Sequence, residues 1–147
     1  MKHSEARTGR VFVLRLEDGE VLHECVERFA AAHGVKAATV VAVGGADAAS
    51  RIVVGPEQDR ALPVVPVERA LEGMHELAGV GTIFPDETGR PVLHMHAALG
   101  REGRAAVGCV RAGVRTWHVL EVVITEIVGS GARRVPDPAT GFRLLVP

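Results

Sequence analysis

Apolar and polar residues alternate along most of the chain, and this pattern predicts β-strands. The run RVFVLRL at 10–16 is rich in β-branched residues and predicts the first strand. Strand-like runs return at residue 36 and continue almost to the C-terminus. We expect further strands within 36–55 (two strands, with a bulge or bend near Gly44 and Gly45), 64–73, 75–84, 92–99, 104–112, 117–127 and 143–146. Loops rich in Pro and Gly are expected at 55–63, 85–91 and 137–142.

Only the segment 20–34 has a helical period. Its apolar residues recur at helical spacing, and Gly34 supplies the C-terminal stop. The residues of this apolar stripe are Val21, Leu22, Cys25, Val26 and Phe29. One helix followed by many closely spaced strands predicts an α+β fold, in which one principal amphipathic helix packs on a mainly antiparallel sheet. The run GVGTIF lacks both the P-loop lysine and the dinucleotide fingerprint, which argues against a nucleotide-binding fold.

Length and composition predict a single domain over 8–147, preceded by a polar tail at 1–7. The 147 residues are 47% hydrophobic and 24% charged, as in folded globular proteins. The formal net charge of -1 leaves no electrostatic footprint for nucleic acid or an anionic membrane. Four Phe, one Trp and no Tyr offer little surface for base stacking.

The two cysteines, Cys25 and Cys109, are too few for a disulfide framework, and we expect both to be reduced thiols. The N-terminal run MKHSEARTGR lacks the apolar stretch of a signal peptide. No stretch of about 18 apolar residues could span a membrane. We therefore expect a cytoplasmic protein without membrane contact.

The run PVLHMHAALG at 91–100 contains the most informative motif, a His-x-His pair. In a strand, His94 and His96 share one face, while the other face is uniformly apolar and should lie on the core. A four-residue hairpin loop at 100–103, or a two-residue loop at 101–102, would pair His94 with Cys109. Directly opposed residues share a face, so this register brings Cys109 beside both histidines, whereas a loop of odd length would place it on the other face.

Two imidazoles and a thiolate form a ligand set suited to Zn²⁺, with a fourth position left for water or substrate. The alternative is that both histidines are hydrogen-bonded core or interface residues and that Cys109 is a small buried hydrophobe. Four further candidates for this site are His118, His75, Glu76 and Glu121. We expect each of them to be peripheral, and a regular strand cannot place His118 and Glu121 on one face.

Six segments in this order resemble the PPC (plant and prokaryote conserved) domain, which also occurs in plant AT-hook nuclear-localised proteins. They are RLEDGEVLHECVERFAAAHGV, AVGGADAASRIVVG, ELAGVGTI, LHMHAALGREGRAAVGCV, EVVITEI and TGFRLL, and the likeness covers roughly 8–146. The resemblance implies a homotrimer, with a metal, often zinc, bound by histidines near subunit boundaries. The family's His-x-His corresponds to His94 and His96. Its third histidine, usually in a GGH segment, corresponds to Cys109 in VGC, a departure for which His118 could compensate.

The resemblance leaves three functional hypotheses. The first is a trimeric binding or regulatory protein with a divalent-metal site and room for a small molecule. The second is a metal-dependent lyase or hydrolase acting on a small carbonyl compound, because the fold is also similar to acetolactate decarboxylase, a zinc enzyme with a His-x-His strand. The third is DNA binding, but the plant members contact DNA through an AT-hook, and GREGR at 100–104 breaks that pattern.

Overall fold

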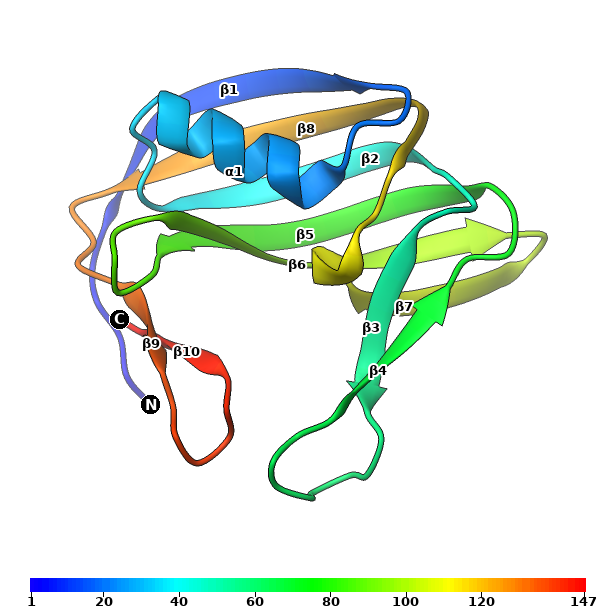
Figure 1. The fold of residues 1–147 in the computed structure, drawn as a ribbon. Coiled ribbons are helices and arrows are strands. Elements are labelled where there is room, and N and C mark those ends of the chain that lie inside the picture. The colour runs from blue at the N-terminus through cyan, green and yellow to red at the C-terminus, as the bar shows by residue number, and fades with distance from the viewer.

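A long antiparallel sheet forms the centre of the protein, and a single α-helix covers one of its faces (Figure 1). The structure is a computed structural model that describes residues 1–147. Its elements are β1 (Arg7–Glu17), α1 (Leu22–Ala32), β2 (Ala38–Ala46), β3 (Arg51–Pro56), β4 (Pro66–Ala70), β5 (His75–Pro85), β6 (Pro91–Arg101), β7 (Arg104–Cys109), the 3₁₀ helix η1 (Val110–Ala112), β8 (Thr116–Val128), β9 (Arg133–Pro136) and β10 (Arg143–Val146).

The main sheet contains eight strands in the order β1-β8-β2-β5-β6-β7-β3-β4, and β9 and β10 form a separate two-stranded ribbon. Every strand pair is antiparallel. The predicted α+β class, a mainly antiparallel sheet with one principal helix, is therefore confirmed. In Figure 1 the β9–β10 ribbon and the β3–β4 arm both project away from α1.

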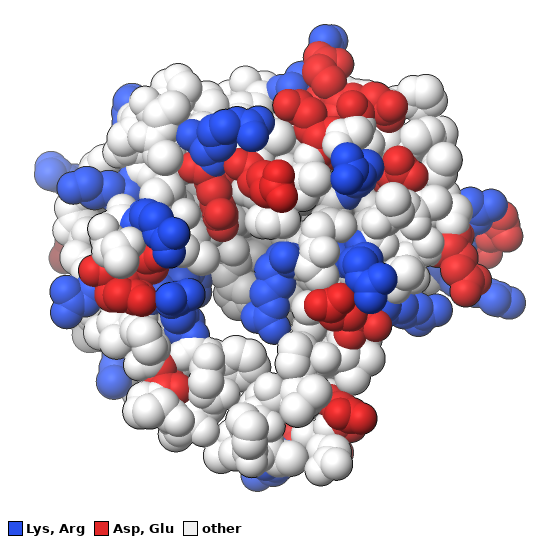
Figure 2. All heavy atoms as spheres, viewed as in Figure 1, with Lys and Arg blue, Asp and Glu red and all other residues white.

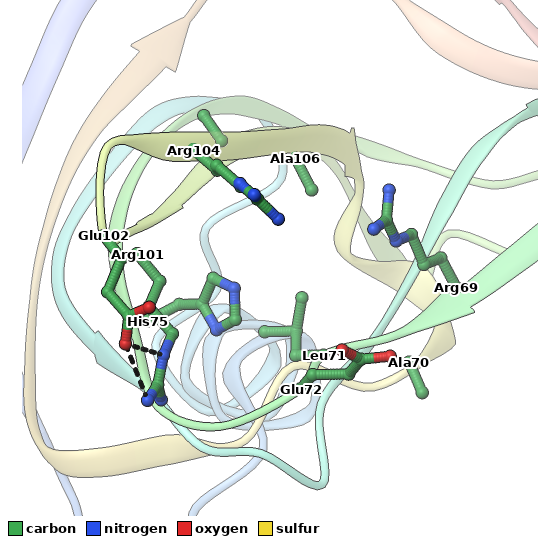
Figure 3. Close-up of a pocket in the computed structure, with 10 residues that line it drawn as sticks. Arg69, Ala70, Leu71, Glu72, His75, Arg101, Glu102, Arg104 and Ala106 are labelled. Carbon is green, nitrogen blue, oxygen red and sulfur yellow. Dashed lines mark hydrogen bonds and ion pairs between the residues drawn. The ribbon is translucent and has the colours of Figure 1, made fainter.

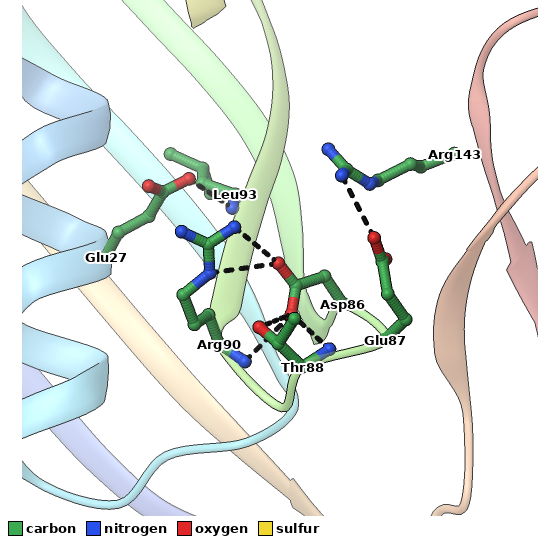
Figure 4. Close-up of polar contacts among 7 residues, drawn as sticks. All are labelled: Glu27, Asp86, Glu87, Thr88, Arg90, Leu93 and Arg143. Carbon is green, nitrogen blue, oxygen red and sulfur yellow. Dashed lines mark hydrogen bonds and ion pairs between the residues drawn. The ribbon is translucent and has the colours of Figure 1, made fainter.

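The helix packs through the apolar stripe that its sequence predicts. Leu22, Val26 and Ala30 are fully buried and join a core of 22 residues. The carboxylate of Glu27 accepts a hydrogen bond of 2.8 Å from the backbone N–H of Leu93 on β6 (Figure 4). The 11-residue α1 ends at Ala32, shortly before Gly34, whose φ of +66° suits glycine. The structure contains no helix with the length and apolar character of a membrane span.

Two local predictions can be compared with the structure: the bulge near Gly44 and Gly45, and the strand at 104–112. The predicted bulge near Gly44 and Gly45 is confirmed, because the register between β2 and β8 shifts between these residues. A Cβ on Gly44 would lie 2.4 Å from the carbonyl oxygen of Val119, so the close approach requires glycine. The predicted strand at 104–112 is wrong in its last part: β7 ends at Cys109, and the chain turns into η1, which buries Val110 in the core.

The turn between β5 and β6 is organised by one buried carboxylate, that of Asp86 (Figure 4). It accepts hydrogen bonds from the backbone N–H and hydroxyl of Thr88 and from the backbone N–H and guanidinium of Arg90. These donors hold the pKa of Asp86 well below its usual range. The adjacent Glu87 forms an ion pair of 3.1 Å with Arg143, which ties the C-terminal ribbon to the same turn.

Candidate metal centre

Strand β6 separates its side chains into a core face and an outer face, as its sequence predicts. Leu93, Met95, Ala97 and Leu99 are all buried in the core. His94 and His96 lie on the opposite face, which is the face of the sheet away from α1. This alternation is confirmed.

Cys109 reaches the same outer face, but through a register that differs by two residues from the predicted one. The predicted pairing of His94 with Cys109 is wrong, because Cys109 pairs with His96 instead. The turn is a two-residue turn at Glu102 and Gly103, with φ of 51° and 75°, as in a type I′ hairpin. Strand β6 therefore runs to Arg101, one or two residues further than either predicted loop allows, and β7 begins at Arg104. A shift of two residues preserves the face, so Cys109 still lies beside the histidines.

The three side chains converge closely enough to share one ion. The Nε2 atoms of His94 and His96 are 3.2 Å apart, and the ligand atoms of both histidines and Cys109 all lie within 4.8 Å of one another. Two nitrogen ligands of a tetrahedral Zn²⁺ with bonds of about 2.0–2.1 Å would be about 3.3 Å apart. The donor set therefore fits a zinc ion, with three protein ligands and one position left over. Without an ion, one of the two Nε2 atoms would carry the proton of a hydrogen bond between the rings.

The electrostatic environment of this cluster is positive. Partial burial, followed by the charges of Arg134, His96 and Arg111, lowers the pKa of His94 below its usual value. This shift favours the neutral imidazole, the form that binds metal ions. Neither Arg134 nor Arg111 forms an ion pair with a carboxylate.

Arg134 is the residue of this site that sequence reasoning missed. It lies on β9, and its Nη2 donates a hydrogen bond of 3.1 Å to the hydroxyl of Thr82 on β5. Thr82 is the cross-strand partner of His94, so these two side chains are neighbours on the outer face. The segment around Arg134 has no strong strand pattern, and no feature of the sequence predicts that it returns to this sheet.

A continuous row of residues crosses the outer face toward the cluster. Cross-strand pairing places Val13, Val123, Val41, Val80, His96 and Cys109 in line over β1, β8, β2, β5, β6 and β7. We call the four valines of this row the valine row. Val13 is 79% exposed and Val80 is 68% exposed, although both are apolar. An unpartnered apolar strip of this kind marks an interaction surface.

The structure does not bring the other two candidates on β8, His118 and Glu121, to the cluster. His118 has a φ of 58° at the start of the strand, and its backbone N–H donates to the Asp18 carboxylate over 2.7 Å. Glu121 is exposed on the outer face, but it pairs with Val43 on β2, so β2 and β5 separate it from β6.

His75 and Glu76 lie at the N-terminal end of β5, away from Thr82, the residue of β5 that pairs with His94. Glu76 pairs with Gly100, four residues along β6 from His96, which is about 13 Å at the usual rise of a strand. His75 lines a pocket of about 360 Å³ between β4, β5 and the β6–β7 hairpin, and its Nδ1 lies 2.9 Å from the carbonyl oxygen of Gly73 (Figure 3). The pocket is also lined by Arg69, Glu72, Arg101, Glu102 and Arg104. It is therefore separate from the His94–His96–Cys109 cluster.

Comparison with known proteins agrees with this fold. The model of the Plants and Prokaryotes Conserved (PCC) domain matches residues 3–128. A metal-containing protein from Archaeoglobus fulgidus superposes with a TM-score of 0.85 at 25% identity, over 100% of both chains. A plant- and prokaryote-conserved (PPC) protein from Pyrococcus horikoshii superposes with a TM-score of 0.80 at 23% identity, over 100% of this chain and 98% of that one.

Two further matches are weaker evidence: one shares only the fold with this chain, and the other is a much longer protein. A candidate DNA-binding protein from Ralstonia eutropha JMP134 has a TM-score of 0.71 at 17% identity, over 92% of this chain and 90% of that one, which shows a shared fold only. The bifunctional protein GlmU of Synechococcus sp. (strain JA-3-3Ab) is 31% identical over 135 residues. That match covers 90% of this chain but only 20% of the length of GlmU.

Proposed function

The chain belongs to the Plants and Prokaryotes Conserved (PCC) domain family, and on this premise we propose that it is a metal-binding protein with a binding or regulatory role. His94, His96 and Cys109 are the proposed ligands of a divalent ion, and zinc is the first candidate. The observation that supports this function best is the convergence of the three ligand atoms within 4.8 Å on one rigid sheet. The metal-containing relative from Archaeoglobus fulgidus is consistent with it.

Zinc suits this ligand set because imidazole and thiolate are both among its preferred protein ligands. Three protein ligands leave one position open to water or to a small molecule, where a bound ion would supply Lewis-acid chemistry. Strands β6 and β7 hold the ligands rigidly, because direct cross-strand pairing fixes His96 against Cys109. The His94 ring is adjacent on the same strand face.

We further propose that the protein acts as a homotrimer, as the family resemblance implies. The valine row supports this assembly, because its exposed apolar side chains need cover and run directly into His96. Subunits that cover this row would also enclose the candidate metal centre.

The enzymatic alternative, a metal-dependent lyase or hydrolase acting on a small carbonyl compound, is favoured only by the open position on the ion. Acid–base chemistry would also need a proton-transfer group near the cluster. Within one chain, Glu76 and Glu121 both lie several residues or strands away from the cluster. This alternative therefore ranks second.

DNA binding ranks third. The relatives that carry a DNA-binding label share only the fold with this chain, at 17% and 13% identity. The formal net charge is -1, and Figure 2 shows acidic and basic side chains interspersed over the visible face. A DNA interface would require a basic surface that the fold does not display on this side.

Elemental analysis of the purified protein, combined with zinc titration, tests the main proposal. We expect about one zinc per chain in the wild type and strong loss of zinc in both His94→Ala and Cys109→Ala. The matched control is His118→Ala, which removes an exposed imidazole away from the cluster and should leave zinc content unchanged. Full zinc content in both ligand variants would show that the site is wrongly assigned.

A further inference from the structure

Arg134 is a buried cation without a counter-ion on any acidic side chain. Only 6% of the residue is exposed, and its Nε has no hydrogen-bond partner. The single hydrogen bond of the guanidinium goes to the neutral hydroxyl of Thr82. Burial of an arginine without a paired anion is costly, so native proteins nearly always supply one.

The guanidinium faces the candidate metal centre. Thr82, which holds its Nη2, is the direct cross-strand partner of His94. Arg134 therefore lies beside the metal ligands and not behind them.

A second arginine increases the positive charge at the same place. Arg111 follows Cys109 by two residues, and its guanidinium carbon lies 5.8 Å from the centre of the ring of Phe142, which belongs to the turn between β9 and β10. With a divalent ion bound to two neutral imidazoles and one thiolate, the cluster and the two arginines would carry a surplus of positive charge. In Figure 2 basic side chains lie at the upper wall of the notch between the two projections that Figure 1 shows as β9–β10 and β3–β4.

We infer that the cluster is the binding site of a small carboxylate, held between the open position of the metal and the guanidinium of Arg134. This inference rests on the proposed metal function. A carboxylate is the matching chemistry because the planar N–H fork of arginine fits its two oxygens, and zinc accepts oxygen ligands beside nitrogen and sulfur. The class is therefore that of short mono- or hydroxycarboxylic acids that fit between the sheet and β9.

The alternative role for Arg134 is purely structural. In that case the Cys109 thiolate alone would compensate its charge, and no external anion would bind. The two roles differ in a measurable way, because a structural arginine would influence metal affinity and folding without creating a site for a carboxylate. The experiment therefore measures metal and carboxylate binding separately.

Cobalt(II) is the probe, since it replaces zinc in such sites and its visible absorption reports the ligands around it. The protein is first titrated with cobalt alone, and the loaded protein is then titrated with acetate, lactate and inorganic phosphate at constant ionic strength. We expect saturable spectral changes with acetate or lactate in the wild type. In Arg134→Gln the carboxylate affinity should fall at least tenfold, while cobalt affinity changes by less than about threefold.

Two variants control for folding and for general charge. Arg133→Gln removes an exposed arginine from the same strand and should leave both affinities unchanged. Arg134→Lys keeps the positive charge but lacks the planar pair of N–H donors of arginine, and it should bind carboxylate with intermediate affinity. Circular dichroism verifies that each variant is folded. If Arg134→Gln does not fold, the comparison of the wild type with Arg134→Lys tests the role of Arg134, and equal carboxylate affinity in these two proteins overturns the inference.

The outcomes distinguish a failure of the proposed carboxylate site from a failure of the proposed metal site. Normal cobalt loading with no carboxylate binding, or with equal binding in Arg134→Gln, overturns the inference and leaves the metal site standing. Saturable binding of phosphate but not of acetate or lactate overturns the carboxylate assignment. Cobalt loading that is the same in His94→Ala as in the wild type shows instead that the proposed metal function has failed.

Discussion

His96 on β6 and Cys109 on β7 are direct cross-strand partners on the outer face of the sheet. Their Cβ atoms are therefore about 4.5–5.5 Å apart in a regular antiparallel pair. His94 is the next residue along the same face, and its Nε2 lies 3.2 Å from that of His96. The proposed site thus depends on one strand pair and needs no loop to close over it.

Removing either member of this pair should weaken metal binding strongly. In His96→Ala and Cys109→Ser we expect zinc affinity to fall by about 100-fold or more, since each change removes one of three protein ligands. Competition with a chromophoric chelator measures the affinity. Cys25→Ser is the matched control, because Cys25 lies on α1, on the other face of the sheet. A loss of affinity in Cys25→Ser equal to that in Cys109→Ser would contradict the assignment.

The valine row should control assembly. Val80 is 68% exposed and is the partner of His96, so Val80→Lys places a charge at the centre of the proposed subunit interface. We expect the wild type to sediment as a trimer and Val80→Lys as a smaller species, with little change in the unfolding of each chain. Leu62→Lys, an equally exposed apolar position in the β3–β4 loop at 61%, should remain trimeric. A wild type that is monomeric at micromolar concentration would exclude the assembly.

The β6–β7 turn should respond to the conformation of its two central residues. Glu102 has a φ of 51°, a region that costs most residues free energy but that Asn adopts more readily. We expect Glu102→Asn to raise the free energy of unfolding by about 0.5–1 kcal/mol. Gly103→Ala, at a φ of 75°, should lower it by about 1 kcal/mol. Urea denaturation measures both free energies. A lower stability of Glu102→Asn, or an unchanged or higher stability of Gly103→Ala, would contradict a type I′ turn.

Acid should remove the contribution of Glu126 to stability. Hydrogen bonds from the guanidinium and backbone N–H of Arg10 lower the pKa of Glu126 from 4.5 to about 2. Because the pKa in the folded state is the lower one, the stabilisation is fully present above about pH 4.5 and disappears as the pH falls toward about 2. We expect Glu126→Gln to be less stable than the wild type at pH 7 and nearly equal to it near pH 2.

Urea midpoints measured across this pH range test the linkage. Glu121→Gln provides the control, because Glu121 is an exposed carboxylate on the same strand that forms no ion pair. Its midpoint should follow that of the wild type at each pH. A difference between Glu126→Gln and the wild type that does not change with pH would contradict the role given to Arg10.

The sequence by itself determined the fold class, the position of α1 and the two faces of β6. These features depend on local periodicity: the 3.6-residue repeat of a helix and the alternation of a strand. The sequence also offered an even-length β6–β7 turn that places Cys109 on the histidine face, but it did not exclude an odd-length turn, and the structure decided between the two. The PCC family could be inferred from the order of the motifs.

Only the tertiary structure decided the register, the valine row and the place of Arg134. A shift of two residues keeps every side chain on its face, so alternation cannot distinguish a pairing of Cys109 with His94 from a pairing with His96. The valine row depends on the order of strands that are distant in the chain. Arg134 reaches the cluster because the β9–β10 ribbon folds back over β5, a long-range contact that no local pattern encodes.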